Sequence, residues 1–274
     1  MQDASLIEQM FGLHANWHEL LYMMCLSSVR LLVIFTVLPA TSDQVLPGGA
    51  RNGVVYLICF FIAAGQPAEA IALVDGTTAL VLVVKEMFIG MVIGYAASTI
   101  FWVAQSVGVV IDNMAGFNNI QTSNPLRGEQ STPISNVLIQ LAIVLFYASG
   151  GMLVLLDVVF ASFRWWPLST ALPTLSGSAE TFLIHRLDSV MTVAVKLVSP
   201  VILVLVLIDL GFGLMARAAD KLEPMALSQP IRGAIALLML VLLTGSFVDE
   251  FKTEFSFRDF RGFFQHGVLG PPAP

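Results

Sequence analysis

Charged residues are scarce in this chain. Asp, Glu, Lys and Arg make up 12% of its 274 residues, whereas a soluble globular protein has about 25%. Hydrophobic residues make up 57%, and the mean hydropathy is +0.83. The net charge of −6 is dispersed, with no basic stripe interleaved with aromatic residues. The composition excludes an ordinary soluble protein, argues against a nucleic-acid partner, and predicts an integral membrane or membrane-assembly protein.

Cysteine and histidine are also few. The two cysteines, Cys25 and Cys59, each lie inside an apolar run and are not in a CxxC spacing. We therefore expect two buried thiols that pack as small hydrophobic side chains. His14 and His18 are spaced i, i+4, but no third ligand accompanies them. This favours the polar face of an interfacial helix over a metal site.

Catalytic motifs are missing as well. The sequence contains no GxSxG elbow, no Walker A loop, no GxGxxG after a strand, and no paired carboxylates flanking a plausible pocket. We expect a protein that is not an enzyme and that carries no cofactor.

Lys and Arg are absent from residues 1–19, which contain Asp3, Glu8 and Glu19. A cleaved signal peptide begins with positive charge, so this stretch does not have the features of one. We expect the first apolar run to remain in the mature protein.

Long apolar segments dominate the rest of the chain. They are long and lack the alternation of a β-barrel, which favours helices over strands. We see no repeat and expect one all-helical domain over residues 1–274, with residues 249–274 as a C-terminal tail. The six segments are 20–38, 53–65, 79–111, 137–163, 190–214 and 231–248.

These segments fit a bilayer poorly. A spanning helix needs about 20 residues to cross ~30 Å of hydrocarbon. Segment 53–65, with 13 residues, reaches only ~20 Å, whereas segment 79–111, with 33, reaches ~50 Å. Small or helix-breaking residues that permit kinks or close helix packing also interrupt them. These residues are Gly90, Gly94, Gly150, Gly151 and Pro200.

Charged side chains intrude into the apolar segments, where each costs at least ~2.5–3.5 kcal/mol at a bilayer centre. Lys196 and Asp209 lie about 220° apart around a straight helix and cannot meet on it. Lys85 and Glu86 are adjacent and are expected to point in different directions. We interpret the set as inter-subunit or buried charges with partners on other helices or other chains; a proton path is the alternative. The set is Arg30, Lys85, Glu86, Asp112, Asp157, Lys196 and Asp209.

Basic residues do not indicate a topology, because six spans would place five Lys and Arg on each side. Helices of such uneven length, with kinks and charges, are typical of a chain that is buried against other proteins. The sequence therefore favours a subunit of a larger membrane assembly.

One long polar stretch, "DNMAGFNNIQTSNPLRGEQSTP" (112–133), separates two of the apolar segments. Its central part, residues 117–131, is called the polar loop below. Pro125 presets a turn after Asn124, and Gly128 can adopt a positive φ. Thr132 is placed to cap a helix that Pro133 opens. A loop of this length is unusual unless it is functional or disordered, and a plain surface connection is the alternative.

Residues 107–151, "VGVVIDNMAGFNNIQTSNPLRGEQSTPISNVLIQLAIVLFYASGG", resemble the T component of the type III secretion export apparatus, the SctT/FliR family. A second stretch, 199–240, is similar to that family where a Gly-rich turn leads to Pro230 and Arg232. Asn124 stands where flagellar members tend to have an acidic residue, which favours the injectisome branch. The features of the first stretch that match are Asp112, Gly116, Asn124-Pro125, Gly128, Ser131-Thr132-Pro133 and Gly150–Gly151.

The resemblance implies a fold and an assembly. Members of that family form kinked helical hairpins that pack with R and S subunits into a closed, helically staggered export gate. The gate belongs to the bacterial inner membrane, much of it above the membrane plane, and its pore carries unfolded substrate proteins. A non-enzymatic structural subunit is thus expected, with R, S and U subunits, substrates in transit and membrane lipid as its partners.

The resemblance also assigns the polar loop to the pore, where it contributes a plug. Small and amide side chains suit a plug because they block a pore without binding one sequence tightly, and Phe117 can act as a hydrophobic wedge. The expected plug residues are Gly116, Phe117, Asn118, Asn119, Ile120, Gln121, Thr122, Ser123, Asn124, Pro125 and Gly128.

Phenylalanines recur at helical spacing near the C-terminus. An amphipathic helix in the lipid interface is one interpretation. Four acidic residues in 249–259 weaken attraction to anionic lipid, which favours a protein groove. In the family the U component, the export switch, is the neighbouring candidate. The expected docking residues are Phe251, Phe255, Phe260 and Phe264.

A stand-alone transporter of small solutes or ions, with broken helices, is the competing function. It predicts internal pseudo-symmetry and charge clusters near the bilayer midplane. The sequence shows no internal repeat, which favours the export gate.

Overall fold

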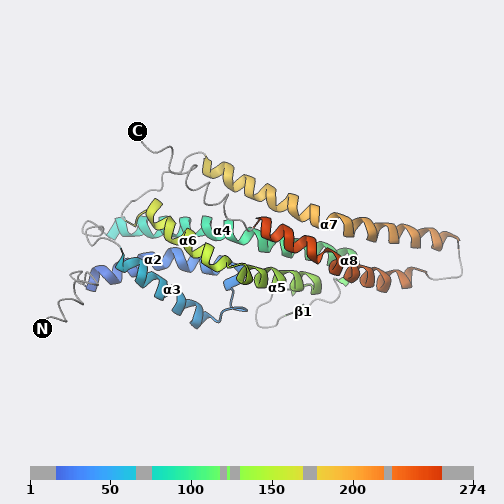
Figure 1. The fold of residues 1–274 in the computed structure, drawn as a ribbon, viewed down its shortest axis with the longest axis horizontal. Helices are drawn as coiled ribbons and strands as arrows, with labels where there is room; N and C mark the ends of the chain where they lie inside the picture. The colour runs from blue at the N-terminus through green and yellow to red at the C-terminus, as the bar shows by residue number, and fades with distance from the viewer. Residues whose placement is uncertain are drawn as a thin grey trace. The chain divides into compact units, whose positions relative to one another are not determined.

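The computed structural model describes residues 17–65, 76–117, 122–123, 130–168, 178–218 and 224–254. In these residues the chain is almost entirely α-helical, which confirms the all-α class. A 3-10 turn, η1 (Pro39–Thr41), and two-residue strands, β1 (Thr122–Ser123) and β2 (Gln130–Ser131), complete it. The helices are α2 (Trp17–Val37), α3 (Gly48–Ala64), α4 (Gly76–Ala115), α5 (Pro133–Ala148), α6 (Gly151–Trp165), α7 (Ser178–Ala218) and α8 (Pro224–Glu254) (Figure 1).

Each predicted apolar segment is helical, and only segment 137–163 is divided. It forms α5 and α6, which are separated at Ser149 and Gly150. Gly150 has a φ of +76°, a backbone conformation that glycine adopts without steric cost. Gly150 and Gly151 were named from the sequence as residues that permit a kink, and the break lies at Gly150.

The part of the chain that the structure describes includes four helices long and apolar enough to cross a membrane. The broken pair α5 and α6 makes a fifth candidate, whereas α3 is a shorter apolar helix of 17 residues. A multi-pass protein of the inner membrane fits these lengths. The four candidate spans are Leu20–Val37, Ala79–Ala115, Leu187–Ala218 and Ser228–Phe251.

The helices divide into two compact units. The first contains α2, α3, the part of α4 up to Ser98, and α6 from Met152 onwards. Gly90 and Gly94 allow α4 to approach α2 closely in this unit. A Cβ at Gly90 would lie 2.7 Å from the carbonyl oxygen of Arg30, and one at Gly94 would lie 3.2 Å from Cβ of Val37. The close helix packing that the sequence allowed at Gly90 and Gly94 is therefore present.

The second unit contains α4 from Thr99, α5, α7 from Phe182, and all of α8. Its core includes an aromatic cluster in which the ring of Phe101 lies 5.5 Å from that of Phe146 and 6.4 Å from that of Phe251. Glycine again permits close packing, because a Cβ at Gly108 of α4 would lie only 2.3 Å from Cα of Ser135 on α5.

The two cysteines differ in burial. Cys59 is fully buried on α3, as expected, whereas Cys25 is exposed on α2. The expectation of two buried thiols was wrong for Cys25, because position in an apolar run does not determine which side of a helix faces the chain's own core.

Candidate functional site

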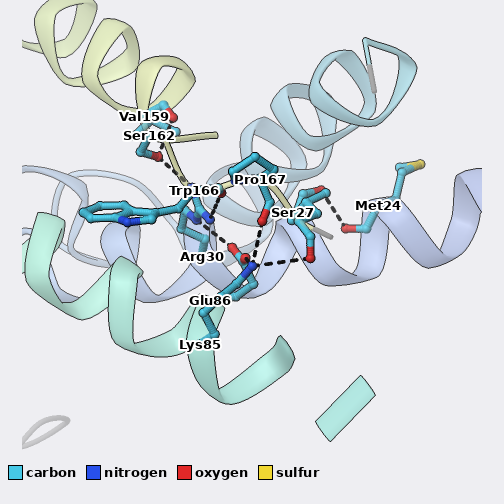
Figure 2. A network of polar contacts seen from close by, with 10 residues as sticks. Met24, Ser27, Arg30, Lys85, Glu86, Val159, Ser162, Trp166 and Pro167 are labelled. Carbon is cyan, nitrogen blue, oxygen red and sulfur yellow. Dashed lines mark hydrogen bonds and ion pairs between the residues drawn. The ribbon is translucent and has the colours of Figure 1, made fainter. Parts of the chain in front are cut away.

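An ion cluster of Arg30, Lys85 and Glu86 lies inside the first unit (Figure 2). Arg30 comes from α2, and the other two residues come from α4. The Arg30 Nε donates to Oε2 of Glu86 at 2.6 Å, and both side chains are fully buried. Nζ of Lys85 lies 3.0 Å from Oε1 of Glu86. One carboxylate therefore faces two buried cations.

The remaining donors of the cluster hold α6 and the turn that follows it. Arg30 donates to Oγ of Ser162 at 2.9 Å and to the carbonyl of Trp166 at 3.0 Å. Lys85 donates to the carbonyl oxygens of Pro167 and Leu168, at 2.8 and 3.3 Å. Figure 2 shows these side chains converging between the three helices. The excess positive charge is thus placed at the carbonyl-rich end of a helix, where cations are favourable.

An aromatic ring adds to this stabilisation. The guanidinium carbon of Arg30 lies 3.9 Å from the ring centroid of Phe163 on α6, within the range of a cation–π interaction. Arg30 contacts α4 through its ion pair and α6 through Ser162 and Phe163. The arrangement joins three helices through one side chain.

The expectation that Lys85 and Glu86 point apart was wrong. Neighbouring helix positions are separated by about 100°, and both of these residues lie on the buried side of α4. Their long side chains converge there and form the 3.0 Å ion pair. Adjacency on a helix does not prevent an ion pair when both residues face the same crowded interior.

The charges of α7 find partners on α8. Lys196 pairs with Glu250 at 2.7 Å, and Asp209 pairs with Arg232 at 3.0 Å. The two α7 residues do not pair with one another, as helix geometry predicted. All four side chains are at least partly exposed, unlike the ion cluster. Asp157 of α6 is exposed in the chain.

The start of the polar loop is held by α8. Gly116 directly follows α4 and has a φ of +82°, and its carbonyl accepts a hydrogen bond from Nε2 of Gln229 at 3.1 Å. The next residue, Phe117, lies against Gly233, where a Cβ would come within 3.0 Å of the end of its ring. Gln229 and Gly233 were not foreseen, because nothing local to α8 indicates a contact with a loop more than 110 residues away.

The far end of the loop is held by α4. The carboxylate of Asp112 accepts hydrogen bonds from the backbone N–H groups of Ile134 and Ser135, at 3.1 and 2.9 Å. Asp112 is fully buried. A negative side chain at these N–H groups satisfies donors that the first turn of α5 leaves unpaired and complements the helix dipole.

Thr132 does not cap α5 with its side chain, so that expectation was wrong. Its Oγ1 is buried without a hydrogen-bond partner, because Asp112 already accepts from the first turn of the helix. Pro133 does open α5, as predicted. Sequence proximity pointed to Thr132, whereas the residue that acts lies 22 positions before Ile134.

Within the polar loop the structure describes Phe117 and the ribbon of β1 and β2. The ribbon is antiparallel, with Thr122 opposite Ser131 and Ser123 opposite Gln130. It brings the two sides of the loop together. The other expected plug residues lie outside the described residues, namely Asn118, Asn119, Ile120, Gln121, Asn124, Pro125 and Gly128.

The expected docking residues divide in a similar way. Phe251 is 3% exposed and lies against Phe247 and Phe101 inside the second unit. Its ring is therefore not available to a partner, and the expectation was wrong for this residue. Helix α8 continues past the apolar segment and places Phe251 against Phe101 of α4. Phe255, Phe260 and Phe264 lie outside the described residues.

Most of the chain is similar to known bacterial export proteins. The family model for bacterial export proteins, family 1, matches residues 21–257. Yop proteins translocation protein T of Yersinia pestis is 31% identical over 214 residues, which cover 78% of this chain and 82% of that protein. Surface presentation of antigens protein SpaR of Salmonella typhimurium is 27% identical over 249 residues, 90% of this chain and 92% of that protein. Flagellar biosynthetic protein FliR of Bacillus subtilis is 24% identical over 218 residues, 78% and 83% of the two chains.

Proposed function

This chain belongs to family 1 of the bacterial export proteins, and we propose that it is a structural, non-enzymatic subunit that helps to form and close the pore of a type III secretion export gate. The relatives named for Yop translocation and surface presentation of antigens are more similar to it than the flagellar relative is. This ranking of identities supports the injectisome branch over the flagellar branch. In the proposal the chain assembles with R and S subunits, and unfolded substrate proteins pass through the shared pore.

Broad apolar surfaces support assembly inside a membrane. Helix α4 carries a stripe at helical spacing in which Leu80, Val84, Met87 and Met91 are each about half exposed or more. On the opposite side of the same helix lie the buried residues of the ion cluster. Lipid and neighbouring subunits are the environments that would cover such a stripe.

The observation that carries the plug proposal is the fastening of both ends of the polar loop. Asp112 of α4 binds the start of α5, and Gly116, which directly follows α4, is only four residues after Asp112. The loop therefore leaves and rejoins the helices at one place. A polar loop with fixed ends can occupy a pore without disturbing the helices that line it.

Shortening the loop tests this proposal. Deletion of residues 124–129 removes the stretch between β1 and β2 and leaves Asp112, Gly116 and the first turn of α5 in place. We expect the variant to co-purify with the R and S subunits while cells lose membrane potential severalfold faster, as reported by a potential-sensitive dye. A length-preserving Gly/Ser replacement of the same six residues is the control for their side-chain chemistry.

An assembled deletion variant that holds the potential as well as wild type would support the plain surface connection. Failure of the variant to co-purify with R and S would place the loop in assembly instead. Both results count against the plug.

A further inference from the structure

The first turns of α8 contact two other parts of the second unit. Gln229, Arg232 and Gly233 are spaced i, i+3 and i+4, so they share one side of the helix. Gln229 donates to the carbonyl of Gly116, and Gly233 lies against Phe117. Arg232 extends to Asp209 on α7. None of these contacts is explained by the apolar core of the unit.

The Gly233 position is shaped by the ring of Phe117. A Cβ there would lie 3.0 Å from both Cε1 and Cζ of that ring, tighter than ordinary van der Waals contact. Gly245, on the same helix, has nothing within 4 Å of its virtual Cβ. Glycine in a helix interior costs about 1 kcal/mol relative to alanine. At Gly233 the ring of Phe117 explains why a larger residue is disfavoured, whereas Gly245 has no such neighbour within 4 Å.

The ion pair between Asp209 and Arg232 fixes the same turn of α8 to α7. Its N–O distance is 3.0 Å, with side-chain exposures of 41% and 26%. Arg232 directly precedes Gly233 and follows Gln229 by three residues. The turn of α8 that contacts Gly116 and Phe117 therefore also contacts α7.

We propose that the first turns of α8 position the start of the polar loop, with Gln229 and Gly233 as positioning residues and the Asp209–Arg232 ion pair as the link to α7. This inference rests on the proposed plug function. It gives Phe117 a different part from the wedge expected from the sequence: the ring fastens the loop to α8. Movement of the α7–α8 pair then changes where the loop begins.

A volume exchange between Gly233 and Phe117 tests the contact in the assembled export complex. Gly233→Leu fills the space of the ring, and Phe117→Ala empties it. We expect each single variant to assemble with R and S and to lose membrane potential severalfold faster than wild type. In the double variant the leucine occupies the space of the ring. This variant should lose membrane potential at close to the wild-type rate, because coupled neighbours give non-additive effects.

Matched variants separate positioning from general damage to α8. Gly245→Leu adds the same side chain to the same helix where no neighbour is displaced, and it should hold the potential as wild type does. Gln229→Ala removes the hydrogen bond to Gly116 without adding volume, and it should leak. If Gly233→Leu fails to assemble, Gly233→Ala and Gln229→Ala still test the proposal.

The results distinguish this inference from the function on which it rests. If the Gly233 and Gln229 variants hold the membrane potential as wild type does while the loop deletion leaks, the positioning role is overturned and the plug proposal stands. A loop deletion that holds the membrane potential as wild type does would overturn both the plug proposal and the positioning role. Leaking single variants with no recovery in the double variant would show that Gly233 and Phe117 act independently, which also overturns the inference.

Discussion

Arg30 and Glu86 are 56 positions apart in the sequence, yet their side chains form a fully buried ion pair of 2.6 Å. The pair joins α2 to α4, and through Lys85 and the backbone after α6 it reaches a third helix. A buried charge without a partner is costly, whereas a fully paired cluster can be close to neutral for stability. The cluster therefore favours this arrangement of α2, α4 and α6 over arrangements that would leave one of its charges buried without a partner.

Glu86→Gln should strongly destabilise the chain. The substitution keeps the shape of the side chain but leaves Arg30 and Lys85 buried without their carboxylate. Removal of one partner of a buried pair typically costs about 3–5 kcal/mol. We expect a lower midpoint of thermal unfolding in mild detergent and a smaller amount of assembled complex.

Asp43→Asn is the matched control for that variant. It removes the pair of Asp43 with Arg51, whose 3.2 Å contact is partly exposed to solvent. Such pairs contribute about 0–1 kcal/mol. Equal loss of stability from the two variants would contradict a special role for the buried cluster.

Gly90→Ala should weaken the packing of α4 on α2. The new Cβ would meet the backbone of Arg30, which cannot move like the end of a side chain. Overpacking of this kind costs about 1–3 kcal/mol. Gly53→Ala on α3 meets nothing within 4 Å and should be neutral or slightly stabilising, since alanine is the better helix former. Thermal unfolding of both variants in the same detergent checks the difference.

Asp112→Ala should loosen the end of the polar loop. Two backbone N–H groups of α5 lose their acceptor, and loss of a helix cap costs about 0.5–2 kcal/mol. Asp112→Asn keeps one acceptor oxygen and should lie between Ala and wild type. Limited proteolysis followed by mass spectrometry would locate the first cut. Cleavage that stays unchanged near Pro133 would argue against Asp112 as the cap.

The C-terminal phenylalanines separate folding from docking. Phe251→Ser places a hydroxyl in the aromatic cluster, and loss of a buried Phe costs about 3–5 kcal/mol. That variant should lower the amount of chain recovered with R and S. A Phe260→Ser/Phe264→Ser double variant should keep R and S and lose the U subunit, if the tail docks it. Unchanged recovery of U with normal secretion would contradict the predicted docking of the tail to U.

Much of the fold was predictable from the sequence because apolar periodicity acts locally. Segments rich in apolar residues became helices, and Gly90 with Gly94 marked a real packing site. Gly150 produced the one break inside a predicted segment, since only glycine adopts its left-handed backbone at no cost. The family resemblance followed from spaced residues that the chain keeps in order.

Polar contacts were harder to predict, because they depend on which side chains meet in the folded interior and not on the local sequence pattern. Asp112 took the place expected for Thr132, and Lys85 met Glu86 although neighbouring positions diverge on a helix. The burial of Phe251 was also missed, since spacing identifies a helical face but not what covers it. Such outcomes depend on which side chains share an interior, which a single sequence does not state.

The fastening of α5 to α4 by Asp112 and by the close contact of Gly108 with Ser135 separates the length of the polar loop from the stability of the helices around it. Closing a flexible loop of twice the length costs only about 0.6 kcal/mol more. The loop can therefore diversify in length and composition during evolution while its two supporting helices stay unchanged. An insertion in the loop is therefore expected to alter closure of the pore while the two supporting helices stay folded.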